Sequence, residues 1–285
     1  MASRQEEKSE GGGHIGRLPE RCISHVLSFT TPRDSCRSAL VSPTFRSAAS
    51  SDALWERFLP SDHQSILSQA VDPVRYSSKK ELYFRLCDSI LIDGGKMSFQ
   101  LERSTGRKCY MISPRSMHII WGWDERYWRW ISLPESRFAE VAELLTVCWL
   151  EVNGNIDTRL LSPRTTYVAY LVFKLASESY GLGPPPQLAS VRLGAYASEI
   201  DVCLQDDDDD DGDGDDSDDD DDQEEGGRWQ QRRHLRDDGW MEIELGEFYN
   251  DVGDDGDVEM SCSSVKALHW KSGLIVQGLE VRPKI

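Results

Sequence analysis

Hydrophobic positions between residues 17 and 59 recur every three or four residues, which is the spacing of one face of a helix. The residues on these faces include Ile23, Val26, Leu27, Cys36 and Leu40. Thr31 and Ser42 each precede a proline, so each pair supplies a capping side chain and a residue suited to the first helical turn. The pattern therefore predicts a group of short helices.

From residue 98 onward hydrophobic positions tend to alternate with polar ones, which is the period of a β-strand. The predicted strands cover residues 98–102, 108–112, 118–122, 147–152, 156–161, 166–173, 189–193, 240–245, 258–262 and 274–281. Asn153, Gly154 and Asn155 form a sequence typical of a hairpin turn. We therefore expect an α+β protein in which a small all-α helical module precedes an antiparallel, jelly-roll-like β-sandwich.

The chain divides into four parts by composition. They are a polar tail at 1–16, the helical module at 17–60, a linker with one helix at 61–95, and the β domain at 96–285. An acidic insertion at 204–227 interrupts the β domain, with 16 Asp or Glu residues and no Lys or Arg. Such a run repels itself and buries no core, so we expect a disordered loop.

The acidic insertion also accounts for most of the net charge. Removing its 16 acids from the formal charge of −18 leaves −2. The rest of the chain is thus almost neutral, and no basic field points to nucleic acid as a ligand.

The cysteines and the N-terminal residues bear on the cellular compartment. The seven cysteines are widely spaced and include no CxxC pair, so we expect free thiols and neither a disulfide framework nor a zinc site. The polar N-terminus does not resemble a targeting signal, and no apolar stretch is long enough to span a bilayer. We therefore expect a cytoplasmic or nuclear protein that binds no membrane.

The helical module is too small to bury all of its hydrophobic faces by itself. Either an obligate partner covers them, or the helices dock on the rest of the same chain. The sequence leaves both alternatives open.

The two modules resemble known families. Residues 17–59 resemble the F-box through Leu18, Pro19, Ile23, Val26, Leu27, Pro32, Cys36, Leu40, Val41, Ser42, Phe45, Arg46, Leu54 and Trp55. The C-terminal part resembles the phloem-lectin domain, which is phloem protein two-like and tobacco-agglutinin-like, through residues 108–113, 118–130, 132–144, 147–156, 161–175 and 239–250. Together they are similar to plant F-box proteins with a C-terminal phloem-lectin domain.

The F-box resemblance implies binding to the Skp-type adaptor of an SCF ubiquitin ligase and, through it, to cullin. The implied adaptor-binding residues are Leu18, Pro19, Ile23, Val26, Leu27, Leu40 and Trp55. The implied function is that of a substrate-receptor subunit of an SCF-type E3 ubiquitin ligase. The alternative is a free carbohydrate- or protein-binding module that is not coupled to degradation.

The lectin resemblance implies a target that carries N-acetylglucosamine or an N-glycan. Two tryptophans seven residues apart bind sugar in that family, and they correspond here to Trp121 and Trp128. Glu242 and Glu247 are the candidate acceptors for sugar hydroxyls.

The other tryptophans are open to a second interpretation. Trp123 has no usual counterpart in the family, and a strand at 118–122 that extends past it would place Trp121 and Trp123 on one face. Tryptophans also belong in sandwich cores, which is the interpretation we favour for Trp149, Trp240 and Trp270.

No pattern in the sequence indicates catalysis. The histidines have no Cys or Asp at metal-ligand spacing, and Ser113, Ser132 and Ser162 lack the G-x-S-x-G context of a nucleophile. We therefore predict a non-catalytic recognition subunit with no catalytic residue, metal or cofactor.

Overall fold

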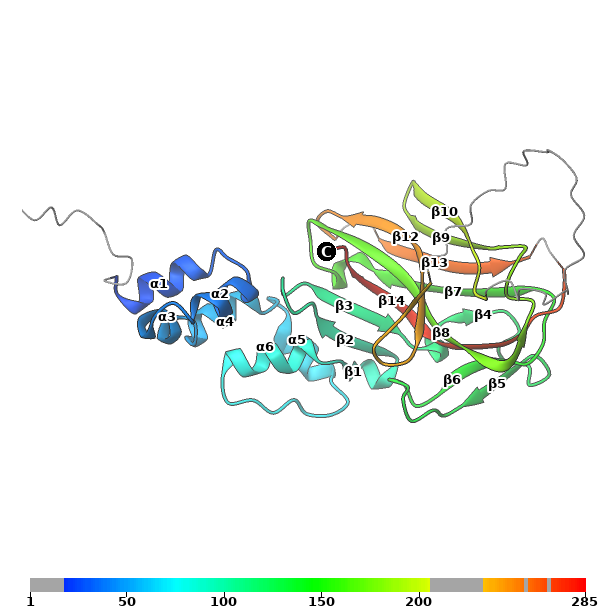
Figure 1. Ribbon diagram of the computed structural model, residues 1–285, viewed down its shortest axis with the longest axis horizontal. Coiled ribbons are helices and arrows are strands. Elements are labelled where there is room, and N and C mark those ends of the chain that lie inside the picture. Colours follow the sequence, from blue (N-terminus) through cyan, green and yellow to red (C-terminus); the bar gives the residue numbers. More distant parts are fainter. Residues whose placement is uncertain (1–17, 206–232, 254–255, 266–267) are drawn as a thin grey trace, which may run out of the picture.

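The computed structural model describes residues 18–205, 233–253, 256–265 and 268–285. The predicted tail at 1–16 and the predicted acidic insertion beyond Gln205 lie outside these ranges. Short helices come first and antiparallel sheets follow, which confirms the predicted α+β fold (Figure 1). Among the described residues, no helix is both long and apolar enough to cross a membrane.

Six short α-helices form the N-terminal part of the described chain. They are α1 (Glu20–Leu27), α2 (Pro32–Ser38), α3 (Pro43–Ala48), α4 (Asp52–Phe58), α5 (His63–Gln69) and α6 (Lys79–Cys87). Thr31 caps α2 and Ser42 caps α3, each by accepting a hydrogen bond from the backbone N–H three residues on. These caps confirm the two predicted helix starts. Helix α5 is not among the predicted helices.

Trp55 lies at the centre of the helical part. Its side chain is fully buried in α4, and its indole N–H donates a hydrogen bond to the backbone oxygen of Ala49 at 2.7 Å. Its ring centroid lies 5.1 Å from that of Tyr83 in α6. The inner hydrophobic face of the helices therefore docks on the same chain, which was one of the two alternatives.

The strands form two antiparallel sheets. The nine-stranded sheet has the order β1 (Ile90–Ile92), β2 (Met97–Leu101), β3 (Lys108–Ile112), β14 (Ser272–Pro283), β8 (Thr165–Tyr180), β12 (Met241–Asn250) and β11 (Arg233–Leu235), with β6 (Val141–Leu144) on β14 and β5 (Trp128–Ile131) on β6. The five-stranded sheet has the order β10 (Tyr196–Val202), β9 (Gln187–Leu193), β13 (Asp257–Ser264), β7 (Leu150–Asp157) and β4 (His118–Ile119).

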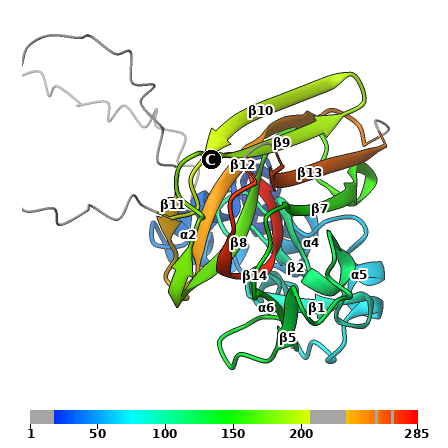
Figure 2. The same ribbon diagram turned by 90° about the vertical axis from the view of Figure 1, so that its right-hand side faces the viewer.

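The core of the β domain lies between the two sheets, which Figure 2 shows as two layers. Successive side chains of a strand point to opposite faces, so alternate residues enter this core. Val152, Val191 and Val258 enter it from the five-stranded sheet, and Phe173 and Leu279 enter it from the nine-stranded sheet.

The predicted hairpin turn at 153–155 is wrong. Asn153, Gly154 and Asn155 lie inside β7, which pairs with β13 along its whole length. A Cβ on Gly154 would lie 2.7 Å from Cδ1 of Leu279. The glycine therefore allows the two sheets to pack closely, a role that the local sequence does not reveal.

The helices are fixed to the β domain at the turn between β2 and β3. The hydroxyl of Tyr83 donates a hydrogen bond to a backbone oxygen of this turn, at 3.1 Å. Gly106 in the same turn has φ 75°, and a Cβ there would lie 3.0 Å from the backbone of α4. Buried Lys108 forms an ion pair with Asp62 at 3.0 Å. The segment at 61–95 thus connects the two modules through packed contacts.

We expect Trp55→Ala to lower the free energy of unfolding by about 3–5 kcal/mol, because it leaves a large cavity. Denaturation by urea, followed by circular dichroism, measures this loss. The control is Trp123→Ala, which removes an exposed side chain and should change stability by no more than about 0.5 kcal/mol. Equal effects of the two substitutions would contradict the assignment of Trp55 to the core.

Candidate functional site

The helical module exposes apolar side chains on α1 and in the segments beside α1 and α2. We call Leu18, Val26, Phe29, Leu40 and Val41 the docking residues. Phe29, Leu40 and Val41 are 75%, 80% and 72% exposed, although the inner side of the module is fully packed. Several large apolar side chains left exposed on one small module are typical of an interaction site.

Leu40 also borders a hollow of about 490 Å³. Pro32 and Cys36 of α2 line one side of the hollow, and Phe84 of α6 lines another. The hollow has room for an apolar side chain of a partner. The apolar surface formed by the docking residues therefore continues towards α6.

The adaptor-binding prediction is corrected at three residues. Ile23, Leu27 and Trp55 are buried, because they pack against the other helices of the same chain. Leu18, Pro19, Val26 and Leu40 are exposed, as the prediction requires. Phe29 and Val41 are equally exposed. Sequence reasoning did not select Phe29 because it follows the last turn of α1 and falls outside the helical stripe.

The tryptophan-rich segment at 118–130 is a short strand followed by a turn. Strand β4 ends at Ile119, and Trp121 has φ 54° in the turn before β5. Trp123 lies in the same turn and is 82% exposed. The predicted common strand face of Trp121 and Trp123 is therefore wrong.

Trp128 belongs to the core. It is buried in β5, and its indole N–H donates a hydrogen bond to the backbone oxygen of Ile120 at 3.1 Å. A buried ring cannot stack on a sugar, which corrects the prediction for Trp128. Trp121 is half-buried, with ring centroids 5.4 Å from Tyr127 and 6.4 Å from Trp149.

The two predicted hydroxyl acceptors lie on the outer face of the nine-stranded sheet. Glu242 is buried and pairs with Arg236 at 2.9 Å and with Arg282. Glu247 pairs with Lys284 near the C-terminus. Glu242 is therefore occupied by arginines, and this is a correction of its predicted role. The structure does not bring either glutamate together with Trp121.

A second carboxylate completes this buried charge network. Glu280 accepts hydrogen bonds from Arg137, at 3.0 Å, and from Arg236. Burial alone would raise the pKa of the Glu280 carboxyl, but the arginines outweigh it and hold the pKa below its ordinary value. The network therefore joins β12 and β14 to the segment after β11.

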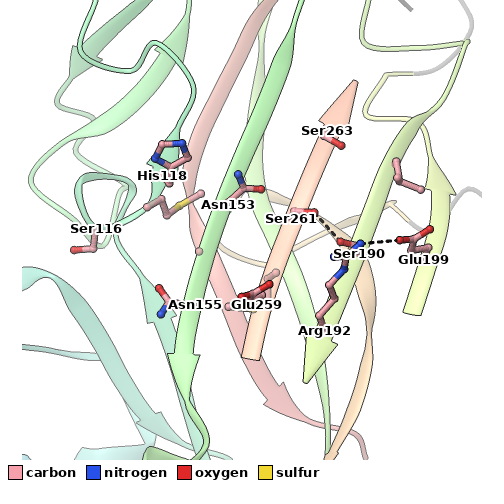
Figure 3. A pocket seen from close by; sticks show the side chains of 14 residues that line it. Ser116, His118, Asn153, Asn155, Ser190, Arg192, Glu199, Glu259, Ser261 and Ser263 are labelled. Atoms are coloured by element: carbon pink, nitrogen blue, oxygen red, sulfur yellow. Dashed lines mark hydrogen bonds and ion pairs between the residues drawn. The ribbon is translucent and has the colours of Figure 1, made fainter. Parts of the chain in front are cut away.

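A polar hollow of about 620 Å³ crosses the outer face of the five-stranded sheet, and we call it the outer groove (Figure 3). Its floor contains one cross-strand row in register: His118, Asn153, Ser261, Ser190 and Glu199. The strand pairing sets this row, because residues paired across antiparallel strands point to the same face. Sequence reasoning missed this row, since each strand contributes one residue to it and the pairing of distant strands is not visible in the sequence.

Hydrogen bonds beside β7 connect Asn153 of the outer groove to an aromatic side chain. Trp149 donates its indole N–H to Glu151 at 3.1 Å, and the side-chain amide of Asn153 donates to the same carboxylate at 2.8 Å. Trp149 and Trp270 are 41% and 57% exposed, so the core interpretation is wrong for both. For Trp240, which is fully buried, it is confirmed.

The described residues contain no group of three or more His, Cys, Asp or Glu that could hold a metal ion. Some of the free cysteines are buried in the β domain. Burial raises the pKa of the Cys262 thiol to about 12, so this side chain stays protonated near neutral pH.

Comparisons with known proteins agree with both modules. The phloem protein 2 family model matches residues 107–283, and the F-box-like model matches residues 15–61. F-box protein PP2-B10 of Arabidopsis thaliana is 44% identical over 288 residues, covering 99% of this chain and 98% of that protein. F-box protein VBF of the same plant is 40% identical over 278 residues, covering 94% of this chain and 99% of that protein.

The likeness to solved structures is slight and supports no argument. A family 35 carbohydrate binding module from Clostridium thermocellum has a TM-score of 0.31 and 8% identity, covering 61% of this chain and 96% of that chain.

The chain belongs to the phloem protein 2 family and carries an F-box ahead of the domain that defines it. This combination is consistent with a non-catalytic recognition protein.

We expect Glu280→Gln to destabilise the fold by about 3–5 kcal/mol, because it leaves buried arginines without their charge partner. The pKa of Glu280 is depressed in the folded state, so its contribution is present above the unfolded pKa and lost as pH falls through the folded one. The difference in stability from the wild type should therefore be full at pH 7 and shrink below about pH 4.5.

Thermal melts from pH 7 to pH 3 measure this difference. The control is Glu247→Gln, whose partly exposed pair with Lys284 should contribute no more than about 1 kcal/mol. A deficit for Glu280→Gln that stayed constant over this pH range would contradict the depressed pKa.

Proposed function

We propose that this chain is the substrate-receptor subunit of an SCF-type ubiquitin ligase. The helical module binds the Skp-type adaptor and, through the adaptor, cullin, while the β domain holds the target protein. The observation that carries the proposal is the exposure of Phe29, Leu40 and Val41 on a module whose inner face is already filled. Exposing an apolar surface of this kind to water raises the free energy of the chain. A partner that covers the surface removes this cost.

Proximity is the mechanism of such a receptor. The contacts of Tyr83 and Lys108 hold the adaptor-binding helices and the β domain in one unit. A target on the β domain is then held near a ubiquitin-loaded enzyme bound elsewhere in the complex, which raises the effective concentration of the reacting groups. This role needs no reacting group in the chain itself.

The finer part of the proposal concerns the target and the compartment. We infer a target protein that carries N-acetylglucosamine or an N-glycan, because the β domain belongs to the phloem protein 2 family and its motifs resemble those of the phloem lectins. Cys109 and Cys262 are buried free thiols, which supports placement in the reducing cytoplasm or nucleus.

The combined substitution Leu40→Asp and Val41→Asp should weaken adaptor binding at least about tenfold, because two carboxylates would be desolvated at an apolar contact. Co-purification of the full chain with the Skp-type adaptor, followed by titration, measures the change. The control is Val71→Asp, an exposed valine outside the docking residues, which should leave the affinity unchanged. Unchanged affinity in the double variant, with an unchanged melting temperature, would sink the docking proposal.

Coupling to degradation needs a separate measurement. The full chain is assembled with adaptor, cullin and a ubiquitin-conjugating enzyme, and ubiquitin transfer to proteins held by the β domain is followed. Transfer that disappears in the double variant supports the receptor role. Adaptor binding without any transfer would favour the alternative, a binding module that is not coupled to degradation.

A further inference from the structure

We propose that the outer edge of β10 binds an extended, basic segment of a target protein by β-strand addition. In this mode the segment pairs its backbone with the free edge of the five-stranded sheet and continues the sheet by one strand. The inference rests on the proposed function that the β domain recruits the target, and it assigns a peptide contact that needs no glycan. β10 stands at the border of its sheet in both ribbon views (Figure 1 and Figure 2).

Of the described strands that lie at the edge of a sheet, β10 is the longest. Its seven residues pair with β9 on one side, and no described strand pairs with its other side. The other edge strands, β1, β4, β5 and β11, have two to four residues each. Proteins usually shorten their edge strands or interrupt them with a bulge, because a long regular edge attracts other chains. β10 has neither protection, since its register with β9 is continuous.

The strand pairing decides which backbone groups of β10 face outward. A two-residue turn joins β9 to β10, so the first pair after it, Leu193 and Tyr196, exchanges both backbone hydrogen bonds. Every second pair does the same, and the residues of β10 between these pairs direct their N–H and C=O groups away from β9. Those residues are Ala197, Glu199 and Asp201, and all three are exposed. Their backbone groups are therefore open to an incoming strand.

The side chains give the edge two different faces. Glu199 and Asp201 point to the outer face of the sheet, because alternate residues of a strand share a face. Tyr196, Ser198 and Ile200 point towards the other sheet, where Ile200 packs against the core and Tyr196 stays 50% exposed. An added strand would thus place every second side chain beside the two carboxylates and the others beside Tyr196 and Ile200.

The carboxylates select a basic segment. Asp201 forms no ion pair with a described residue, and Glu199 pairs with Arg192 at 3.2 Å in an exposed position. Exposed pairs of this kind are weak, so Glu199 remains available to an incoming cation. The formal net charge of −18 also attracts cationic segments from a distance. The edge therefore fits a segment that alternates Lys or Arg with apolar residues.

A second copy of this chain fits the edge poorly. Two β10 strands paired edge to edge would bring Glu199 and Asp201 of one copy beside the same carboxylates of the other. Like charges across paired strands are destabilising. Nucleic acids and acidic peptides meet the same repulsion.

The experiment titrates the full chain with fluorescent peptides of about nine residues, long enough to pair with all of β10. The first peptide alternates lysine with valine, and the second alternates glutamate with valine. The third repeats the first with every backbone amide N-methylated, which keeps the charge and removes the hydrogen-bond donors. Fluorescence anisotropy should give a dissociation constant on the order of 100 µM or below for the first peptide, and at least about tenfold weaker binding for the other two.

Two edge variants and a matched control locate the site. Ala197→Pro removes an outward N–H but no hydrogen bond to β9, so it should weaken binding of the lysine–valine peptide at least about fivefold. Glu199→Lys combined with Asp201→Lys should weaken it at least about tenfold. The control, Asp257→Lys combined with Glu259→Lys, makes the same change in charge on β13, a strand paired on both sides. It should stay within about twofold of the wild type.

Melting temperatures show whether each variant is folded, and the methylated peptide keeps the test valid if Ala197→Pro unfolds. The inference is overturned if the folded wild type does not bind the lysine–valine peptide at about 1 mM, or if the methylated peptide binds equally well. It is also overturned if folded edge variants bind like the wild type, or if the control loses as much affinity as they do.

Sedimentation of the full chain without peptide tests the other occupant. A monomer is expected, and a dimer that Ala197→Pro dissociates would assign the edge to a second copy and overturn the inference. Adaptor binding and ubiquitin transfer are measured without these peptides. Failure of the strand-addition inference is therefore distinguishable from failure of the receptor proposal.

Discussion

The packing of Trp55 against α6 is the interaction on which the arrangement of the molecule depends. It fills the inner side of the helical module with residues of the same chain, and Tyr83 carries the contact on to the turn between β2 and β3. The outer side of the helices is left with exposed apolar residues such as Phe29 and Leu40. Because Trp55 is packed inside the chain, the helical module has a filled inner face and an outer face that is available to a partner. The contacts of Tyr83 fix the module relative to the β domain.

The same division between inside and outside occurs in the β domain. Strand pleating sends Val152, Val191 and Val258 into the core and turns their polar neighbours outward. Register then brings polar residues of five strands into one row across the outer groove. The outer face of the nine-stranded sheet differs, because Glu242 and Glu280 are satisfied by arginines. The sandwich therefore has one outer face stabilised by internal ion pairs and another that presents its polar groups to solvent.

Part of this organisation could be predicted from local patterns. The capping side chains of Thr31 and Ser42 fixed two helix starts, since a cap acts within three residues of itself. Hydrophobic strand patterns located parts of the long strands that pair on both sides, such as β8 and β14. Motif order also indicated the F-box and the phloem protein 2 domain, both of which the family comparisons match.

Exposure of individual side chains was decided only by tertiary structure. Trp128 was expected at a sugar site and Trp149 in the core, yet the first is buried in β5 and the second is 41% exposed, with its indole N–H donated to Glu151. Asn153 and Asn155 were expected in a turn, but Gly154 lies close to Leu279 of the other sheet, and β7 pairs with β13 through all three residues. Local patterns were enough to identify the type of each module and most of its elements, because caps and periodicity act over a few residues. Which side chains meet in a site depended on register and on contacts between distant strands, and these are set only when the sheets pack together.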